Sequence, residues 1–186
     1  IGLALSACSP SNETAIKSAT TSEVEVNYQA TGIIAKSLPE IAQALDSGEI
    51  SSEELVRLYL ERIKAIDKQG PRLQAVLSLN PDALEQAKAL DVMRADGVIK
   101  GPLHGIPILL KDNIETMDNI ATTAGALALK DNITHRDSPL VAGLRAQGAI
   151  ILGKTNLSQW ANFRSEDSMS GWSALGGQVR NPHMLD

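Results

Sequence analysis

The sequence predicts an α/β fold in which a central sheet is covered by helices. Helical patterns alternate along the chain with short apolar runs, and the connections between them are short. Two of these runs, 106–110 and 149–152, hold no polar side chain, which is typical of strands buried on both faces. With 186 residues, of which 43% are hydrophobic, the chain is long enough for one domain with a substantial core.

Capping residues and glycines delimit the predicted helices. Ser51 and Glu54 have the spacing of a capping box, and Gly70 and Pro71 stop the helix that they open. A later helix opens at Ser138-Pro139 and ends at a glycine. In order, we expect helices over 38–48, 51–69, 80–95, 124–129, 138–147 and 157–163, and strands over 73–79, 106–110 and 149–152.

The first residues resemble the signal of a bacterial lipoprotein. An apolar stretch leads into Leu5-Ser6-Ala7-Cys8, which has the pattern of a lipobox, and no charged segment precedes it. The resemblance implies that Cys8 is the lipidated first residue of an exported protein, anchored in a membrane on the periplasmic side or at the cell surface. The alternative is an ordinary free thiol in a disordered tail. The single cysteine of the chain cannot form an internal disulfide, which favours the lipobox.

Three parts follow from these patterns. Residues 1–7 are expected to be the remnant of a lipoprotein signal peptide. Residues 8–36 begin with a stretch rich in Ser, Thr, Asn and Glu and are expected to be a flexible tether. Residues 37–186 carry the helix and strand patterns, and we expect them to be the N-terminal portion of a domain that continues beyond the chain.

Charge and residue spacing argue against several classes of site. The formal net charge is −5 without a basic stripe, so nucleic acid is not an expected partner. His104, His135 and His183 lie far apart without the spacing of metal ligands, so neither a metal site nor another cofactor is expected. Because His104 follows a Gly-Pro turn signal, we expect its ring to bond to backbone groups rather than act as a base.

One motif match fails on physical grounds. Residues 148–155, Gly-Ala-Ile-Ile-Leu-Gly-Lys-Thr, fit the pattern of a nucleotide-binding phosphate loop. Such a loop needs a strand before the first glycine and a small, turning segment between the two glycines. Here a helical pattern precedes Gly148, and Ala-Ile-Ile-Leu favours a buried strand. We therefore predict a strand at this position and no phosphate loop.

The stretch Gly101–Asn113, GPLHGIPILLKDN, is the most informative part of the chain. Its apolar run predicts a central strand that begins near Pro107, where a missing backbone donor is tolerated. Lys111 would emerge at the carboxyl end of that strand, which is where open α/β sheets bind their ligands. From these residues alone, a solvated lysine that ends a strand is the alternative.

Three segments together resemble the landmarks of the amidase signature family. The first is GPLHGIP at residues 101–107 with Lys-Asp-Asn at 111–113, and the second is AIILGKTNLS at 149–158. The third is SGWSA at 170–174, followed by GGQ at 176–178 and Asn-Pro at 181–182. They occur in family order and spacing, and the resemblance extends from about Leu38 to Asp186. The segment 160–174 is similar to bacterial peptide amidases in particular, which hydrolyse the C-terminal amide of peptides.

The resemblance implies a mechanism and several site residues. The family fold has a mixed central sheet covered by helices, and its members use a Ser–cis-Ser–Lys triad that forms an acyl-enzyme. Only Lys111 matches a triad position, and burial behind the apolar run is expected to lower the pKa of its amine. The two serines and the oxyanion donors are expected beyond Asp186. The third landmark is expected to line the substrate cleft, with Met169, Ser170 and Gly171 facing the acyl group. The serines of that segment are therefore not triad candidates: Ser165, Ser168, Ser170 and Ser173.

The expected function is therefore amidohydrolysis of a peptide or small-molecule amide, and residues 8–186 alone are expected to be inactive. Two alternatives remain open. One is the glutamine-hydrolysing subunit of a tRNA-dependent amidotransferase, against which the lipobox argues because tRNA charging is cytoplasmic. The other is an anchored binding protein that keeps the fold without catalysis. Oligomeric state and substrate identity are not predicted.

Overall fold

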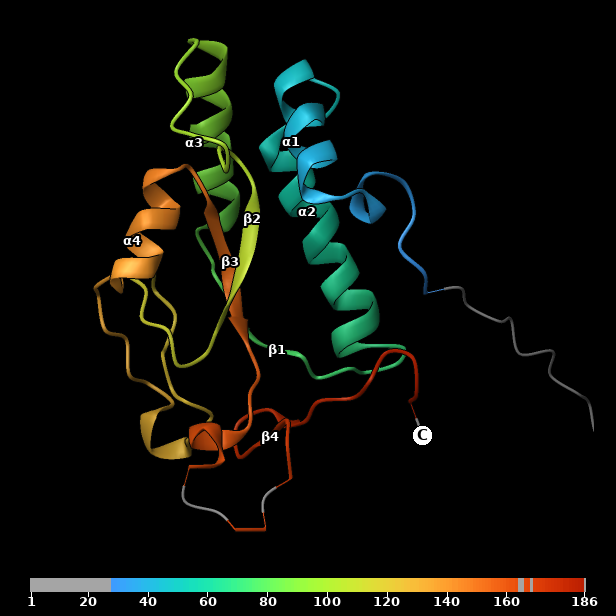
Figure 1. Cartoon of the computed structure of the whole chain (residues 1–186), viewed down its shortest axis with the longest axis vertical. Coiled ribbons are helices and arrows are strands. Elements are labelled where there is room, and N and C mark those ends of the chain that lie inside the picture. The colour runs from blue at the N-terminus through green and yellow to red at the C-terminus, as the bar shows by residue number, and fades with distance from the viewer. Residues whose placement is uncertain (1–27, 164–165, 168, 186) are drawn as a thin grey trace, which may run out of the picture.

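The computed structural model describes residues 28–163, 166–167 and 169–185 (Figure 1). Cys8, the predicted signal remnant 1–7 and most of the predicted tether lie outside the described residues. The division into remnant, tether and domain therefore stays a prediction. Within the described part, packed structure already includes Ile33 of the 3-10 helix Gly32–Ala35, since this side chain contacts the helical core.

A three-stranded mixed sheet forms the centre of the described fold. Its strands lie in the order β1-β3-β2, and β3 pairs antiparallel with β1 and parallel with β2. A separate two-stranded hairpin follows near the end of the chain. The bounds are β1 Val76–Leu79, β2 Pro107–Lys111, β3 Ile150–Thr155, β4 Trp172–Ser173 and β5 Gly177–Gln178.

The helices begin and end close to the predicted positions. The hydroxyl of Ser51 accepts a hydrogen bond from the backbone N–H of Glu54, and Gly48 ends α1 in the left-handed conformation. The predicted second helix continues past α2 as a π-helix to Lys68. The bounds are α1 Leu38–Ser47, α2 Ser52–Arg62, the π-helix Ile63–Lys68, α3 Ala83–Ala95 and α4 Pro139–Ala146, with short 3-10 helices at Leu127–Leu129 and Gln159–Asn162. None of the helices within the described residues is long and apolar enough to cross a membrane.

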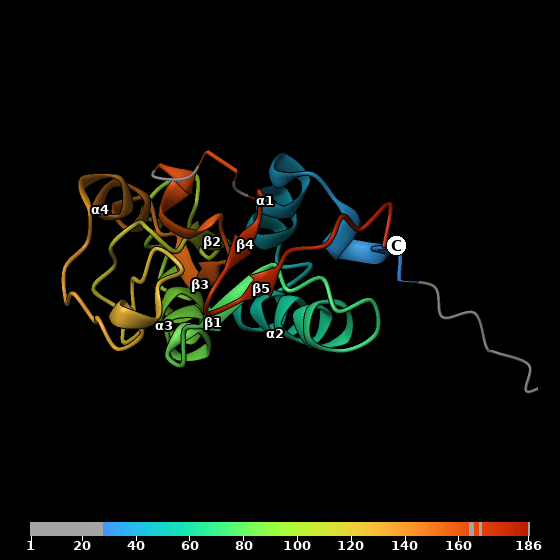
Figure 2. The same ribbon diagram turned by 90° about the horizontal axis from the view of Figure 1, so that it is seen from below.

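Helices cover both faces of the sheet (Figure 2). On one face, Ile150 and Leu152 of β3 pack against α2 and α3. On the other, Ile151 packs with Val141 of α4 and Leu110 of β2. Because successive side chains of a strand point to opposite faces, two covered faces require the unbroken apolar run Ile150–Leu152 at the start of β3.

The described residues confirm the strand predicted at 106–110 but do not show it at the centre of the sheet. β2 begins at Pro107 as expected, but it forms one edge of the described sheet, and β3 is the strand between two neighbours. Leu109 is 37% exposed, so the described residues do not cover both faces of β2. An apolar run indicates burial, but it does not tell which strand is central.

The stretch 157–163 also differs from the prediction. Instead of a regular helix it forms a single 3-10 turn in which Trp160 and Ala161 have positive φ angles of 52° and 55°. Right-handed helical structure excludes such angles, so the apolar spacing here does not reflect a helix face.

The resemblance of residues 148–155 to a phosphate loop has a structural explanation. Gly148 follows α4 with a φ of +87°, and a Cβ there would lie 2.6 Å from the Cα of His104. A Cβ on Gly153 would lie 2.3 Å from the carbonyl oxygen of Ser78 in β1. Both glycines permit close backbone approaches, and the residues between them belong mostly to β3. The prediction of a strand in place of a phosphate loop is confirmed.

Candidate functional site

Lys111 ends β2 and lies opposite Thr155, the last residue of the parallel strand β3. This is the carboxyl end of both strands, as expected for a ligand site in an α/β sheet. The side chain of Lys111 is exposed in the described structure. Within the run before it, only Ile106 and Leu110 are buried in the described part, so the expected burial of Lys111 stays a prediction for the full-length protein.

A different lysine is buried beside it. Lys154 of β3 is 0% exposed, and its Nζ donates hydrogen bonds of 2.7 Å to the carbonyl oxygen of Ile114 and to the hydroxyl of Thr122. The nearest carboxylate oxygen is Oδ1 of Asp112, at 4.0 Å. Both polar partners belong to the segment 112–125 that follows Lys111. Reasoning from the sequence missed Lys154, which entered only as part of the phosphate-loop match and of the second landmark.

Asp112 is buried next to Lys111 and anchors the far end of the same segment. Its Oδ2 accepts hydrogen bonds from the backbone and hydroxyl of Thr123 and from the backbone of Gly125. Its own backbone N–H donates to the carbonyl oxygen of Thr155, which extends the pairing of β2 and β3 by one residue. The residue after Lys111 is thus fixed through both its main chain and its side chain.

Burial shifts the pKa values of Asp112 and Lys154 in opposite directions. Desolvation raises the pKa of the Asp112 carboxyl, against the opposing effects of the Thr123 hydroxyl and the charge of Lys154. Desolvation likewise lowers the pKa of the Lys154 amine, although nearby carboxylates, Asp112 first, act to raise it. Both groups are therefore more easily neutral here than in water.

A bulge explains why Lys154 points toward the segment after β2. Ile108 pairs with Ile151 and Leu109 with Gly153, so Leu152 is one extra residue in β3. An extra residue shifts the alternation of side chains between the two faces. Lys154 then lies opposite Leu110, on the face where Ile114 packs, rather than on the face of Leu152.

A second network connects α4 to this region. Arg145 of α4 pairs with Asp118 at 2.7 Å and with Asp137 at 2.9 Å. Burial acts to raise the pKa of Asp118, but hydrogen bonds from Thr116 and Arg145 outweigh it and hold the pKa below its ordinary value. Burial also acts to raise the pKa of Asp137, and hydrogen bonds from Arg145 and from the backbone of Met117 outweigh it in the same way. Both carboxylates therefore favour the ionised form and hold residues 116–118, in the middle of the segment, against α4.

The structure joins the second and third landmarks. The Nδ2 group of Asn156 donates to the carbonyl oxygens of Gln74 and Gly177, and its Oδ1 accepts a hydrogen bond from the hydroxyl of Ser173. The hydroxyl of Ser158 accepts a 2.7 Å bond from the backbone N–H of Gly171. Residues that resemble family landmarks therefore act, in part, as the connection between β3 and the terminal hairpin.

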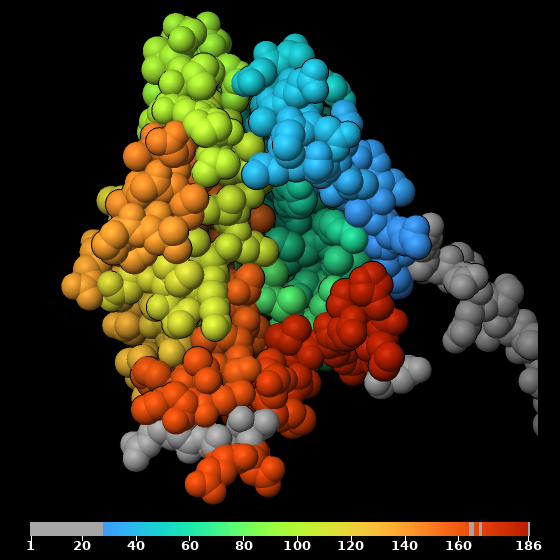
Figure 3. Space-filling model, in the orientation of Figure 1, coloured from blue at the N-terminus to red at the C-terminus, as the bar shows by residue number. Residues whose placement is uncertain are grey.

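Met169, Ser170 and Gly171 lie in the turn before β4. Met169 is 66% exposed, and the carbonyl oxygen of Ser170 accepts a hydrogen bond from the Gln178 side chain. The hairpin that follows this turn contacts the segment after β2, because the backbone N–H of Leu175 donates to the carbonyl oxygen of Gly125. Figure 3 shows that segment (yellow) beside the orange-to-red residues at one end of the molecule. The role of Met169, Ser170 and Gly171 in substrate binding stays a prediction. Ser165 and Ser168 lie outside the described residues.

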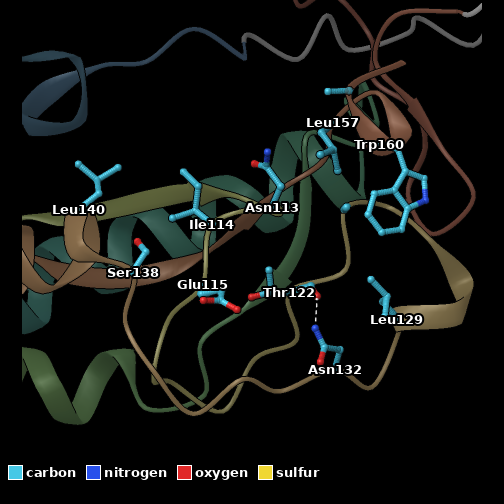
Figure 4. A pocket seen from close by; sticks show the side chains of 12 residues that line it. Asn113, Ile114, Glu115, Thr122, Leu129, Asn132, Ser138, Leu140, Leu157 and Trp160 are labelled. Carbon is cyan, nitrogen blue, oxygen red and sulfur yellow. Dashed lines mark hydrogen bonds between the residues drawn. The ribbon is translucent and has the colours of Figure 1, made fainter. Parts of the chain in front are cut away.

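An open cavity of about 620 Å³ lies beside the segment after β2 (Figure 4). Its walls come from this segment, from the start of α4 and from the turn after β3, as Glu115, Ser138 and Trp160 illustrate. Thr122, which accepts a hydrogen bond from Lys154, contributes to the wall. The buried network therefore lies directly behind a cavity of a size suited to small molecules.

The hypothesis for His104 is confirmed. Its buried ring accepts a hydrogen bond at Nδ1 from the backbone N–H of Lys100 and contacts the carbonyl oxygen of Leu90 through Nε2 at 2.9 Å. Because a backbone N–H can only donate, Nδ1 is the acceptor and Nε2 carries the hydrogen. The described residues also contain no group of three or more His, Cys, Asp or Glu side chains arranged to hold a metal ion.

Comparison with known proteins agrees with the resemblance seen in the sequence. Among solved structures, the peptide amidase of Stenotrophomonas maltophilia is 53% identical, with a TM-score of 0.78 over 81% of this chain and 30% of that chain. A probable amidase of Arabidopsis thaliana is 47% identical over 80% of this chain and 29% of its own length. A subunit of the glutamyl-tRNA(Gln) amidotransferase of Moorella thermoacetica is 39% identical over 79% of this chain and 28% of its own length.

This chain thus spans under a third of the length of the relatives that it matches. The family model for amidases matches residues 54–186, which contain the whole sheet and the three landmarks. The chain therefore belongs to the Amidase family.

Proposed function

We propose that the full-length protein containing this chain is an amidohydrolase that cleaves the C–N bond of a carboxamide. A serine oxygen attacks the amide carbonyl, the C–N bond breaks, and ammonia or an amine leaves with a proton. Water then hydrolyses the acyl-enzyme to a carboxylate and restores the serine. Lys111 is the terminal base of a Ser–cis-Ser–Lys triad whose serines lie beyond residue 186.

The observation that carries this proposal is the 53% identity to a peptide amidase of solved structure, together with the position of Lys111 at the carboxyl end of β2. For substrates we favour peptide C-terminal amides or small-molecule amides. The glutamine-hydrolysing amidotransferase component remains the second candidate, because the Moorella relative is also 39% identical. An anchored binding protein without catalysis is the third.

The test measures ammonia release by the full-length protein from C-terminally amidated peptides, small carboxamides and glutamine. Hydrolysis of amidated peptides supports the first candidate, whereas activity restricted to glutamine supports the amidotransferase component. Absence of release from every amide would support the binding protein. Purified residues 8–186 serve as a further sample, and we expect them to be inactive.

The role of Lys111 is tested with Lys111→Ala in the full-length protein. We expect kcat/KM to fall by about 10³-fold, because the triad loses its base. Lys130→Ala is the matched control, since the Lys130 side chain is 65% exposed and ends a short 3-10 helix. Activity of Lys111→Ala within tenfold of the control would contradict the assignment.

We also propose that Cys8 carries the lipid anchor of an exported lipoprotein, with a membrane as its partner. The support is the lipobox pattern Leu5-Ser6-Ala7-Cys8 alone. Mass spectrometry of the protein from a bacterial host should find acyl chains on Cys8, and globomycin should block processing. Unmodified Cys8 in a protein that keeps its leader would refute the anchor.

A further inference from the structure

The buried side chain of Lys154 binds both the outgoing and the returning part of the segment after β2. The Nζ of Lys154 donates to the carbonyl oxygen of Ile114, two residues after Asp112, and to the hydroxyl of Thr122 on the returning limb. The lysine is fully buried, so these bonds do not compete with bulk water. Lys154 thus spans the base of the segment and connects its two limbs to the sheet.

Asp112 also joins the beginning of the same segment to its end. Its carboxylate binds the backbone of Thr123 and Gly125, and its main-chain carbonyl oxygen accepts hydrogen bonds from the N–H groups of Thr123 and Ala124. Asp112 Oδ1, which is not used in these side-chain bonds, lies 4.0 Å from Lys154 Nζ. Asp112 is therefore held by the end of the segment and lies beside Lys154. Because Lys111 is the preceding residue, these contacts also fix the position of its backbone.

We propose that Lys154, acting through Asp112, is a positioning residue for Lys111. This inference rests on the proposed function, in which Lys111 is the base. Without the ammonium group, the Ile114 carbonyl and the Thr122 hydroxyl would lose the donor that they share, and the segment would relax toward other donors. A displacement of about 1 Å at a catalytic group can reduce turnover by about 100-fold.

The experiment compares Lys154→Met with Leu45→Ala in the full-length protein. Methionine keeps a long apolar side chain but removes the amine. Leu45 is 1% exposed in the core cluster of α1 and α2, so its truncation lowers stability without removing a contact of the segment. Three experiments are done on each variant: steady-state kinetics for kcat and KM with an amide, the pH profile of kcat/KM, and hydrogen exchange at Thr123, Ala124 and Gly125.

For Lys154→Met we expect kcat to fall about 100-fold while KM stays within about threefold, since an interaction needed in the transition state is lost. The pH profile of kcat/KM should change in Lys154→Met and keep its wild-type form in Leu45→Ala, because only the first variant disturbs the segment next to Lys111. Exchange at the three amides should accelerate in Lys154→Met and stay unchanged in Leu45→Ala. A kcat within threefold of the Leu45→Ala value would overturn the inference.

A second variant covers the case in which Lys154→Met does not fold. Thr122→Val keeps the shape of the side chain but removes one acceptor of Lys154, and we expect kcat to fall about tenfold. A wild-type kcat in Thr122→Val would then overturn the inference.

The two proposals can fail separately. The proposed function fails if the wild type releases no ammonia, or if Lys111→Ala stays active. The positioning role alone fails if the wild type is active and Lys111→Ala is inactive, but Lys154→Met behaves like Leu45→Ala in both kcat and amide exchange.

Discussion

The hydroxyl of Ser173 donates a 2.6 Å hydrogen bond to the carboxamide oxygen of Asn156, and so joins the terminal hairpin to the end of β3. Ser173 is fully buried, and its oxygen also accepts the backbone N–H of Gly176. We predict that Ser173→Ala lowers the free energy of unfolding by about 2 kcal/mol, because Gly176 loses a buried acceptor.

Chemical denaturation measures this loss, and hydrogen exchange at Gly176 should accelerate. Ser47→Ala is the control, because Ser47 is exposed at the end of α1, and its change should stay within about 0.5 kcal/mol. Equal midpoints for the two variants would show that the bond between the landmarks has no stabilising role.

The close approach of β1 to β3 at Gly153 gives a second prediction. A Cβ at this position would lie 2.3 Å from the Ser78 carbonyl oxygen, so the backbones must separate to admit it. Gly153→Ala should therefore lower the free energy of unfolding by about 3 kcal/mol. Gly143→Ala is a matched control in α4, where a Cβ meets no atom within 4 Å, and it should raise stability by about 0.5–1 kcal/mol. A neutral Gly153→Ala would show that the two strands do not depend on this close approach.

His104 provides a third prediction, which separates a structural histidine from a catalytic one. His104→Ala removes hydrogen bonds to Lys100 and Leu90 and leaves a buried space, so unfolding should become easier by about 3 kcal/mol. At a temperature where the variant remains folded, kcat should stay within threefold of wild type. His183→Ala, at an exposed position, should change neither quantity. A folded His104→Ala protein without activity would contradict the structural role.

Local signals in the sequence predicted the helices and strands well. The caps at Ser51 and Ser138 and the terminating Gly48 act through neighbours within four residues, so the pattern alone identifies them. The apolar first part of β3, Ile150–Leu152, was also predicted, because two covered faces leave no room for alternation of polar and apolar side chains. Such signals can be interpreted without knowing the tertiary contacts between distant parts of the chain.

The candidate site was predicted less completely, for the opposite reason. Lys154 contacts Ile114 and Thr122 at separations of 40 and 32 residues, and only the fold brings them together. The bulge at Leu152 decides which face Lys154 occupies, and nothing in an apolar run indicates it. The same limit applies to Lys111: its burial depends on which elements flank β2, and the sequence pattern does not contain that order.

The pairing of Arg145 with Asp118 gives the last prediction, a dependence of stability on pH. The folded state holds the pKa of Asp118 below its ordinary value of 3.8, so the unfolded chain binds more protons as the pH falls. Its contribution to stability is therefore present above pH 3.8 and is lost as the pH falls through the lower, folded value. Asp118→Asn should lower the free energy of unfolding by about 2 kcal/mol at pH 7 and reduce the loss of stability between pH 5 and about pH 3.

Asp131→Asn is the control, because the Asp131 side chain is 86% exposed, and it should keep the wild-type pH dependence. Urea denaturation at a series of pH values measures both. If Asp118→Asn lost stability with falling pH as steeply as Asp131→Asn, the ion pair would not be the source of the acid sensitivity.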